Sequence, residues 1–281
     1  MTRPKDFRIS KKGWAGCLSL WLGFILSTTP AQAASHKITY AVYAGGIHVV
    51  EAHLDVSYPA KDRYRIFLDA KTRGFLGALA PWEGTFESAG WRLKGDPPLR
   101  PEMHESVATW RGTPDIKEYR YTKDGGFVDI HITEDRKPRK KHSVKDEITQ
   151  GTTDAFTAGL IVMEEIAAGG KCEGSAEVFD GKRRFEQIFK DAGSEDLTAN
   201  SYNIYSGPTS KCTIEIKPIS GEWSKKPRGW LSIQEQGRDK GTLPTVWMGQ
   251  FSEGGPALPV KILVKTSYGT LIMHAIKHTE E

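Results

Sequence analysis

Apolar and polar residues alternate along much of the chain, which is the pattern of strands with one buried face. The clearest run extends from Val50 to Tyr58, where every second residue is apolar or aromatic and the residues between them are polar. Similar runs stand on either side, separated by short turns that contain glycine or proline. The pattern predicts an antiparallel meander that packs one face on a core.

Two turn signals predict hairpins. Ser88-Ala89-Gly90, between apolar runs at 82–87 and 91–94, predicts a hairpin with a three-residue loop. Asp180-Gly181 is the strongest short hairpin signal in the chain. Later strands are expected at residues 197–205, 211–217, 230–235, 245–251, 260–266 and 270–277.

The spacing of apolar residues changes to a helical period after Thr153-Asp154, where either residue can cap a helix. Phe156, Leu160 and Met163 then fall on one face, and most of the remaining residues are apolar too. A helix that is apolar nearly all round is a buried one. We therefore expect a helix over residues 156–168 that fills the concave side of a curved sheet.

The first 33 residues have the layout of a signal peptide. A basic start is followed by an apolar core from Leu18 to Leu26 and by the small-residue site Ala31-Gln32-Ala33. The apolar core is shorter than the roughly 20 residues that a membrane-spanning helix needs. We predict cleavage after Ala33, which leaves residues 34–281 as a single periplasmic β domain. A lipoprotein based on Cys17 is the alternative, but no apolar core precedes that cysteine.

Removal of this leader changes the charge balance. The chain has 39 Lys and Arg against 35 Asp and Glu; five of the basic residues and one acidic residue lie in the leader, so 34 of each remain. A formally neutral chain gives no support for a nucleic-acid partner. No later stretch is long and apolar enough to span a membrane.

Two cysteines, Cys172 and Cys212, remain in the mature chain. In an oxidising compartment an even pair predicts a disulfide, and two buried free thiols are the alternative. Closing a loop of this size removes about 4 kcal/mol of unfolded-state entropy in a simple chain model. We therefore predict that the two cysteines form a structural disulfide and do not act as nucleophiles.

Several segments together resemble a known family. They are Thr153-Asp154, Val178–Arg183, Lys211-Cys212, Pro218–Gly221, Val246-Trp247-Met248, Leu258–Ile262 and Tyr268-Gly269-Thr270. These segments resemble the proteobacterial domain-of-unknown-function family 3108, over nearly all of the mature chain. The resemblance implies an exported protein with no assigned reaction, similar in layout to envelope-integrity β-spiral proteins and distantly to lipoprotein-carrier half-barrels. It supports the Cys172–Cys212 bridge and carries no catalytic residues onto this chain.

The expected fold is mostly β. It consists of a single strongly curved antiparallel sheet, a β-spiral or half-barrel, wrapped around one short central helix. In such a sheet Phe156, Leu160, Met163 and Trp247 are candidates to line a cavity for a lipid or another apolar ligand. Ordinary core packing of the same side chains is the competing interpretation.

Candidate chemistry is sparse. Glu51, His53 and Asp55 share one face of a strand and would place metal ligands together, although His104 or another histidine would have to complete the site. The solvent face of a half-buried strand explains the same pattern. Metalloprotease, nucleophile-elbow and phosphate-loop motifs are missing from the sequence. We predict no catalytic residue, no metal site and no cofactor.

These observations predict a non-enzymatic periplasmic protein with a role in cell-envelope maintenance. It would bind a lipid, glycan or protein partner on the concave face of its sheet. A purely structural or interaction module is one alternative. A hydrolase or metal-dependent enzyme that uses the Glu51, His53 and Asp55 face is the other.

Overall fold

The alternating segments form one antiparallel sheet of 14 strands in the part of the chain that the structure describes. The structure is a computed structural model that describes residues 34–134, 137, 140–223, 230–266 and 269–281. Residues 1–33 lie outside this part, so the signal peptide and its cleavage after Ala33 stay predictions. The expected mostly β fold, a single curved antiparallel sheet around a central helix, is confirmed.

Short connections join most strands of the first half, and in the second half longer ones separate β10, β11, β12 and β13. The first eight strands are β1 (Ala34–Ala44), β2 (Ile47–Ala60), β3 (Arg63–Thr72), β4 (Trp82–Arg92), β5 (Leu99–Trp110), β6 (Thr113–Tyr121), β7 (Phe127–Thr133) and β8 (Lys140–His142). The later ones are β9 (Gly174–Phe179), β10 (Arg183–Leu197), β11 (Gly207–Gly221), β12 (Thr245–Gly249), β13 (Leu258–Thr266) and β14 (Gly269–Glu280). The helices are α1 (Gly74–Leu79), α2 (Asp146–Thr149), α3 (Ala155–Ala167) and α4 (Trp230–Asp239).

The strand order places the first and last strands side by side inside the sheet. The order is β8-β7-β6-β5-β4-β3-β2-β1-β14-β13-β12-β11-β10-β9. Strands β1 to β8 form a continuous meander, and β14 joins it to the second half by pairing with β1. Within β2, Ala52, Leu54 and Val56 are buried, as the alternation predicts. The hairpin predicted at Asp180-Gly181 is confirmed, because this turn joins β9 to β10.

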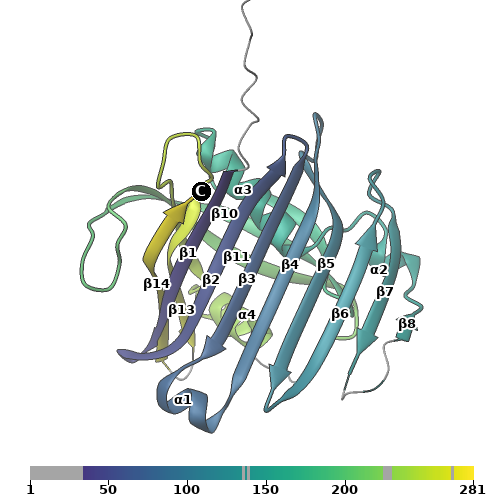
Figure 1. Cartoon of the computed structure of the whole chain (residues 1–281), viewed down its shortest axis with the longest axis horizontal. Helices are drawn as coiled ribbons and strands as arrows, with labels where there is room; N and C mark the ends of the chain where they lie inside the picture. Colours follow the sequence, from purple (N-terminus) through teal and green to yellow (C-terminus); the bar gives the residue numbers. More distant parts are fainter. Residues whose placement is uncertain (1–33, 135–136, 138–139, 224–229, 267–268) are drawn as a thin grey trace, which may run out of the picture. The chain divides into compact units, whose positions relative to one another are not determined.

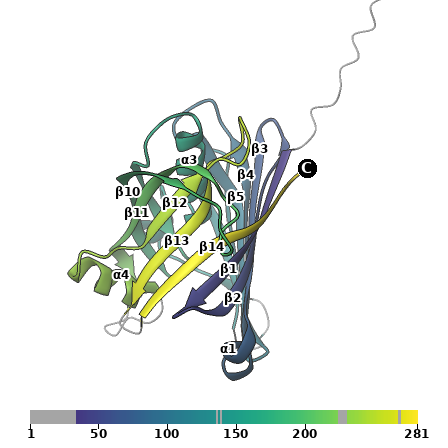
Figure 2. The same ribbon diagram turned by 90° about the vertical axis from the view of Figure 1, so that its left-hand side faces the viewer.

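The sheet curves around α3, so that strands far apart in its order share one core (Figures 1 and 2). Leu54 of β2 and Tyr64 of β3 belong to the same buried cluster as Val246 of β12 and Leu258 of β13. Leu160 of α3 completes this cluster. In a flat sheet β3 and β12 would stand roughly 24 Å apart, at about 4.8 Å per strand. Curvature is therefore what allows one short helix to cover both halves.

Helix α3 begins at an aspartate cap, as the sequence predicts. Asp154 precedes the first helical residue, and its Oδ1 accepts hydrogen bonds from the backbone N–H groups of Phe156 and Thr157. These bonds satisfy two of the amide groups that a helix start leaves without partners. Gly169 follows the last turn with a φ of 87°, a left-handed conformation that favours glycine. The helix predicted over residues 156–168 is confirmed.

The two edges of the sheet approach each other without pairing, since β8 and β9 are its end strands among the described residues. The turn after β9 instead lies against β6. The Tyr119 hydroxyl donates to the carbonyl oxygen of Phe179 (3.1 Å), and Lys117 Nζ donates to that of Asp180 (3.3 Å). The ring of Phe179 is buried against Tyr119 and Phe127. We call this zone of side-chain contact the seam of the sheet.

The hairpin predicted at Ser88-Ala89-Gly90 is wrong, because β4 runs straight through this segment. Gly90 allows β4 and β5 to approach each other closely, and it does not form a turn. A Cβ atom at this position would stand 2.0 Å from the backbone oxygen of Arg100 on β5. Ser88 is buried, and its hydroxyl donates to Asp154. A small polar residue and a glycine inside a strand resemble a turn signal, although both are explained by neighbours distant in the sequence.

The strand predicted at Trp230–Glu235 is also wrong, since these residues lie in helix α4. The side chain of Gln234 bonds the backbone of β11 beyond the part that β12 covers. Its Oε1 accepts from the N–H of Ile216 (3.1 Å), and its Nε2 donates to the carbonyl oxygen of Ile214 (3.2 Å). Arg238, one turn later, donates to the carbonyl oxygen of Ile216 (2.7 Å). The helix therefore covers a strand edge that would otherwise be open.

The chain leaves the sheet where a further strand is predicted, at residues 197–205. Strand β10 ends at Leu197, and β11 begins at Gly207. Between them, Asn203 Nδ2 donates to the carbonyl oxygen of Val260 (2.9 Å). Single hydrogen bonds of this kind replace the strand ladder that the apolar pattern predicts.

Candidate functional site

Three of the residues predicted to line a ligand cavity belong to α3 itself. Leu160 and Met163 lie in the main core, with 0% and 7% of their surface exposed. Phe156 packs against the same core and stacks on His104, with ring centroids 5.9 Å apart. From the helix, these side chains fill the concave side of the sheet.

Trp247 does not share this surface. Its neighbours Val246 and Met248 face the core around α3, and successive side chains of a strand point to opposite faces. Trp247 accordingly belongs to a separate cluster on the other face of the sheet. Its indole Nε1 donates to Glu195 Oε2 (2.9 Å), and Lys261 Nζ lies 4.3 Å from its ring centroid. The four predicted residues therefore do not form one cavity wall.

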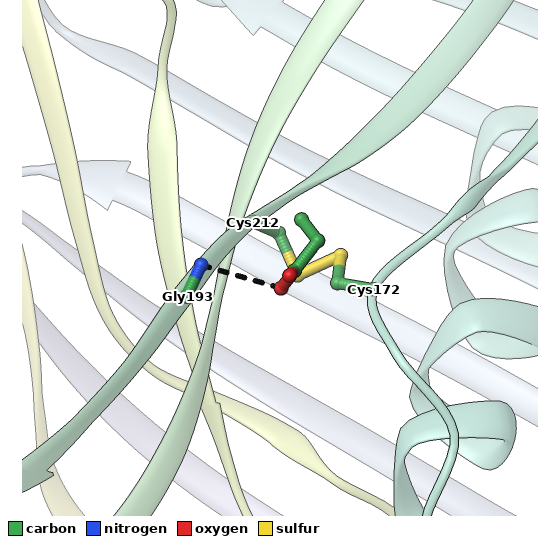
Figure 3. The surroundings of a disulfide bond; sticks show 4 residues. Cys172, Gly193 and Cys212 are labelled. Carbon is green, nitrogen blue, oxygen red and sulfur yellow. Dashed lines mark hydrogen bonds between the residues drawn. A yellow bond between two sulfur atoms is a disulfide. The ribbon is translucent and has the colours of Figure 1, made fainter.

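A disulfide joins Cys172, in the segment after α3, to Cys212 on β11 (Figure 3). The two Cα atoms are 5.7 Å apart, a normal separation for such a bond. Neither cysteine exposes any surface. The bond fixes the carboxyl end of the central helix to the second half of the sheet.

A buried polar network lies beneath the amino terminus of α3. Besides its backbone partners, Asp154 accepts hydrogen bonds from Ser88 Oγ (2.7 Å) and Thr157 Oγ1 (2.5 Å). His104 Nδ1 lies 2.7 Å from Ser88 Oγ and 3.5 Å from Asp154 Oδ1, and the Tyr64 hydroxyl lies 2.7 Å from Thr157 Oγ1. Burial acts to raise the pKa of Asp154, but the interactions with His104, Thr157 and Ser88 outweigh it and hold the pKa below its ordinary value.

This network contains the residue types of a serine hydrolase, yet its geometry differs from one. In a catalytic triad the histidine bonds the serine through one ring nitrogen and the aspartate through the other. Here His104 presents the same Nδ1 to both residues, and Ser88 donates its proton directly to Asp154. Ser88 also exposes none of its surface. The arrangement ties α3 to β4 and β5.

The sequence predicts only one member of this network, the cap residue Asp154. Ser88 falls in a segment that predicts a turn, and His104 has no partner within its own segment. The inward position of both residues follows once β4 and β5 are taken as continuous strands. Because buried polar side chains need partners, a buried serine and histidine on adjacent strands are the signal that points to a third polar group above them.

The face formed by Glu51, His53 and Asp55 is occupied by interactions with neighbouring strands and turns. His53 Nδ1 lies 3.0 Å from Asp69 Oδ1 on β3, and Arg73 Nη2 donates to Glu51 Oε2 (2.9 Å). In the described part of the chain, no group of three His, Cys, Asp or Glu side chains is placed to hold a metal ion. The arrangement matches the charged outer face of a half-buried strand.

A pocket of ≈ 360 Å³ opens at the seam, beside α3 rather than beneath it. Its volume lies in the range of small-ligand sites. Five segments supply its walls: residues 96–101, Tyr121 with the turn at 124–125, residues 151–153, Ile161 of α3 and residues 175–177 of β9. This pocket is the candidate binding site of the molecule.

One wall of the pocket is a free edge of β9. The N–H of Thr153 donates to the carbonyl oxygen of Glu177 (2.9 Å), and the N–H of Phe179 donates to the carbonyl oxygen of Thr153 (3.0 Å). Backbone groups alternate along a strand, so those of Ser175, like those of Glu177, point away from β10. Among the described residues no backbone partner meets the N–H and C=O of Ser175 or the N–H of Glu177.

Carboxylates dominate the charged groups of the pocket. Asp96, Asp124 and Glu177 line it together with one basic residue, Arg100. Arg184, from outside the lining, donates from Nε and Nη2 to Glu177 Oε2 and forms an ion pair with it. The remaining balance is acidic, so the pocket is complementary to a ligand with a positive charge.

No helix among the described residues has the length and apolar character needed to cross a bilayer. No curated protein sequence matches the chain significantly. A crystal structure of a β-barrel-like protein of domain of unknown function DUF1849 from Brucella abortus is similar to it, with a TM-score of 0.47 and 8% identity over 88% of this chain and 98% of that chain. The family model described as "Protein of unknown function (DUF3108)" matches residues 39–276, from β1 to β14. This match confirms the resemblance seen in the sequence, and the chain belongs to the DUF3108 family of proteins of unknown function.

Proposed function

We propose that this protein is a non-enzymatic, exported component of the cell envelope that binds an extended peptide segment of a partner protein in the seam pocket. The observation that carries the proposal is the free edge of β9 in the pocket wall. An extended peptide adds to such an edge as a further strand. Main-chain hydrogen bonds to Ser175 and Glu177 would supply affinity, and the surrounding side chains would supply specificity.

The lining favours a peptide over a lipid. Lipid sites are lined mainly by apolar side chains. The apolar side chains of α3, such as Leu160 and Met163, are packed in the core and are therefore not available to line such a site. Asp96 and Asp124 would repel the phosphate or carboxylate of a lipid head group. The same carboxylates would pair with a lysine or arginine of a bound peptide.

The compartment follows from two observations that support each other. The leader has the layout of a signal peptide, which directs export and is removed after Ala33. The Cys172–Cys212 disulfide is of a kind that persists in oxidising compartments. We infer a periplasmic location and a role in envelope maintenance that is exerted through binding.

The non-enzymatic part of the proposal draws on the placement of the reactive side chains. Ser88 and His104 are buried within the network that anchors α3, and His53 pairs with Asp69 on an outward face. An enzyme that used the His53 face would lose its function in a His53→Ala variant. The proposal expects this variant to keep wild-type function in a cell that depends on the protein.

Site-specific photocrosslinking in the native cell tests the binding proposal. A photoreactive amino acid at Pro98, an exposed residue of the pocket wall, should capture a partner protein, whereas the same group at Thr85, exposed on β4 outside the pocket, should not. Adding Ser175→Pro removes the outward N–H without removing a bond to β10, so it should abolish the crosslink. Ser175→Ala keeps that N–H and should preserve the crosslink.

Three results would overturn the proposal. The first is equal capture from Pro98 and Thr85, and the second is capture that survives Ser175→Pro in a variant whose melting temperature is unchanged. The third is the absence of any crosslinked protein from either position, which would favour a purely structural module. Mass spectrometry of the captured product identifies the partner segment and shows whether it carries the expected basic residue.

A further inference from the structure

Helix α1 presents its apolar side chains to solvent. None of its six residues is buried, and Phe75 and Leu79 expose 76% and 57% of their surface. The helix lies at one end of the sheet, between β3 and β4 (Figures 1 and 2). Large apolar side chains gathered on one exposed element mark an interaction site.

Two neighbouring strand ends extend this surface. They contribute Ile47, the first residue of β2, and Trp110, the last residue of β5, each more than half exposed. Both adjoin α1, because the N–H of Arg73 donates to a carbonyl oxygen of β2 (2.8 Å) and the N–H of Arg111 donates to that of Pro81 (3.1 Å). The surface, which we name the apolar tip, consists of Ile47, Phe75, Leu76, Leu79 and Trp110.

Arginines stand at both ends of α1. Arg73 directly precedes the helix and is exposed. Arg111 Nη2 donates to the carbonyl oxygen of Leu79 (3.4 Å) at the other end, and its guanidinium lies 5.9 Å from the ring centroid of Trp110. Cations placed beside exposed apolar and indole side chains are typical of segments that lie at a membrane surface.

The acidic groups near the apolar tip are balanced locally. Glu51 binds Arg73 and is the less exposed partner, at 18% against 45% for the arginine side chain. Glu83 stands opposite Lys71 in the register of β3 and β4. Among the described residues Arg111 forms no ion pair, so its positive charge beside the tip is available to an anion.

We propose that the apolar tip docks the protein on a lipid bilayer that contains anionic head groups. The side chains of α1 would enter the boundary between head groups and acyl chains, and Trp110 would lie at the level of the head groups. Arg73 and Arg111 would bind the lipid phosphates. This contact is peripheral, and it needs no membrane-spanning segment.

A bilayer fits the apolar tip better than a second copy of the chain does. A two-fold contact would bring Arg73 and Arg111 of one copy toward the same residues of the other. Charge complementarity therefore opposes self-association through the tip and favours an anionic surface.

The apolar tip and the seam pocket lie at opposite ends of the same strands. Strand β4 begins next to α1 and ends at Arg92, from where the chain continues into the pocket lining at residues 96–101. A protein docked through its tip would keep the pocket free. Membrane docking is therefore independent of the peptide-binding proposal, and either can fail alone.

Sedimentation with vesicles tests the docking. The purified, oxidised protein is mixed with vesicles of phosphatidylcholine, with or without phosphatidylglycerol, at low salt. We expect binding to the vesicles with phosphatidylglycerol, weakened at least about tenfold in a Phe75→Ser, Leu76→Ser, Leu79→Ser variant. A Val128→Ser variant removes an exposed side chain of β7, 49% exposed, at the end of the meander away from the tip, and should bind like wild type.

Further readouts separate the contributions and check the fold. Arg73→Gln with Arg111→Gln should remove the preference for phosphatidylglycerol. Brominated lipids should quench a larger fraction of the total tryptophan fluorescence in wild type than in Trp110→Phe. The tip variant should melt like wild type, because none of its substituted residues is buried. Absence of vesicle binding, or equal binding by the tip variant, would overturn the proposal. So would a lipid-free dimer that the tip variant abolishes.

Discussion

The Asp154 network offers the sharpest test of how the central helix is held. Replacement of Asp154 by alanine removes the cap of α3 and leaves the N–H groups of Phe156 and Thr157 without their acceptor. Replacement by asparagine keeps an oxygen for the two backbone N–H groups; it removes the charge and puts an NH2 group in place of Oδ2, which accepts from Thr157. The two variants therefore separate the geometry of the cap from its ionisation.

The magnitudes follow from the contacts. Loss of a helix cap costs about 1 kcal/mol, and a buried amide group left without a partner costs about 1–3 kcal/mol. The hydroxyls of Ser88 and Thr157 keep partners in His104 and Tyr64, so they add little. We expect Asp154→Ala to lower the free energy of unfolding by about 3–4 kcal/mol. Asparagine caps helices as well as aspartate does, so Asp154→Asn should lose about 1–2 kcal/mol.

Urea and thermal denaturation, followed by tryptophan fluorescence under oxidising conditions, measure both values. For a chain of this size, the alanine variant should melt about 10 °C below wild type and the asparagine variant about 4 °C below it. Equal losses in the two variants would refute the assigned role of the cap oxygen. A loss near zero in Asp154→Ala would refute the network as the anchor of α3.

The dependence of the unfolding free energy on pH in the acid range provides a second test of the role of Asp154. The folded protein holds the pKa of Asp154 below its ordinary value. Its contribution to stability is therefore fully present above about pH 4, the unfolded pKa of an aspartate, and is lost as the pH falls through the folded pKa. The gap in unfolding free energy between wild type and Asp154→Asn should shrink below about pH 4. A gap that stays constant there would contradict the depressed pKa.

Three further predictions concern the bridge, the strand interior and the seam. The double variant Cys172→Ser, Cys212→Ser removes a disulfide that spans 40 residues. Its free energy of unfolding, measured in urea, should be about 4 kcal/mol lower than that of wild type. An unchanged value would show that the bond adds no stability. Gly90→Ala should lower the free energy of unfolding by about 3 kcal/mol, because the new Cβ would meet backbone at 2.0 Å. The control Gly159→Ala in α3 meets nothing within 4 Å and should raise the free energy of unfolding by about 0.5–1 kcal/mol. Similar values for the two variants would contradict the packing argument. Tyr119→Phe removes the hydroxyl that bonds β9 across the seam, so it should cost about 1 kcal/mol and speed amide exchange in β9. Unaltered exchange would show that the seam is held without this bond.

Features that depend on neighbours along the chain could be predicted from the sequence. Alternation identifies the buried face of β2, because side chains of a strand reverse direction at every residue. The same reasoning places α3 and the turn at Asp180-Gly181, where the residues themselves determine the local conformation. Features that depend on neighbours across the sheet could not be predicted. Gly90 reflects the approach of β5, and Gln234 reflects an open stretch of β11.

The candidate site likewise combines a residue that could be predicted from its neighbours along the chain with residues that could not. Asp154 is predictable as a helix cap, yet its partners come from strands that only the meander brings beneath α3. The seam pocket has no sequence signature, because five separate segments meet only when the sheet has curled far enough for β9 to approach β6. The placement of Trp247 depends on which residues of β12 face inward. The apolar pattern of Val246-Trp247-Met248 leaves that register undetermined, since all three residues are apolar.

The pairing of β1 with β14 determines the order in which this protein can be completed. A chain that enters its compartment amino terminus first can build the meander at once, but the outer edge of β1 stays open until the last strand arrives. Lys37 and Glu281, 244 residues apart, form an ion pair at this junction. A product cut short before β14 would carry two open edges, on β1 and β13, in addition to those of the end strands β8 and β9, and such edges can pair with other chains. The strand β14 therefore decides whether the facing edges of β1 and β13 are paired or exposed.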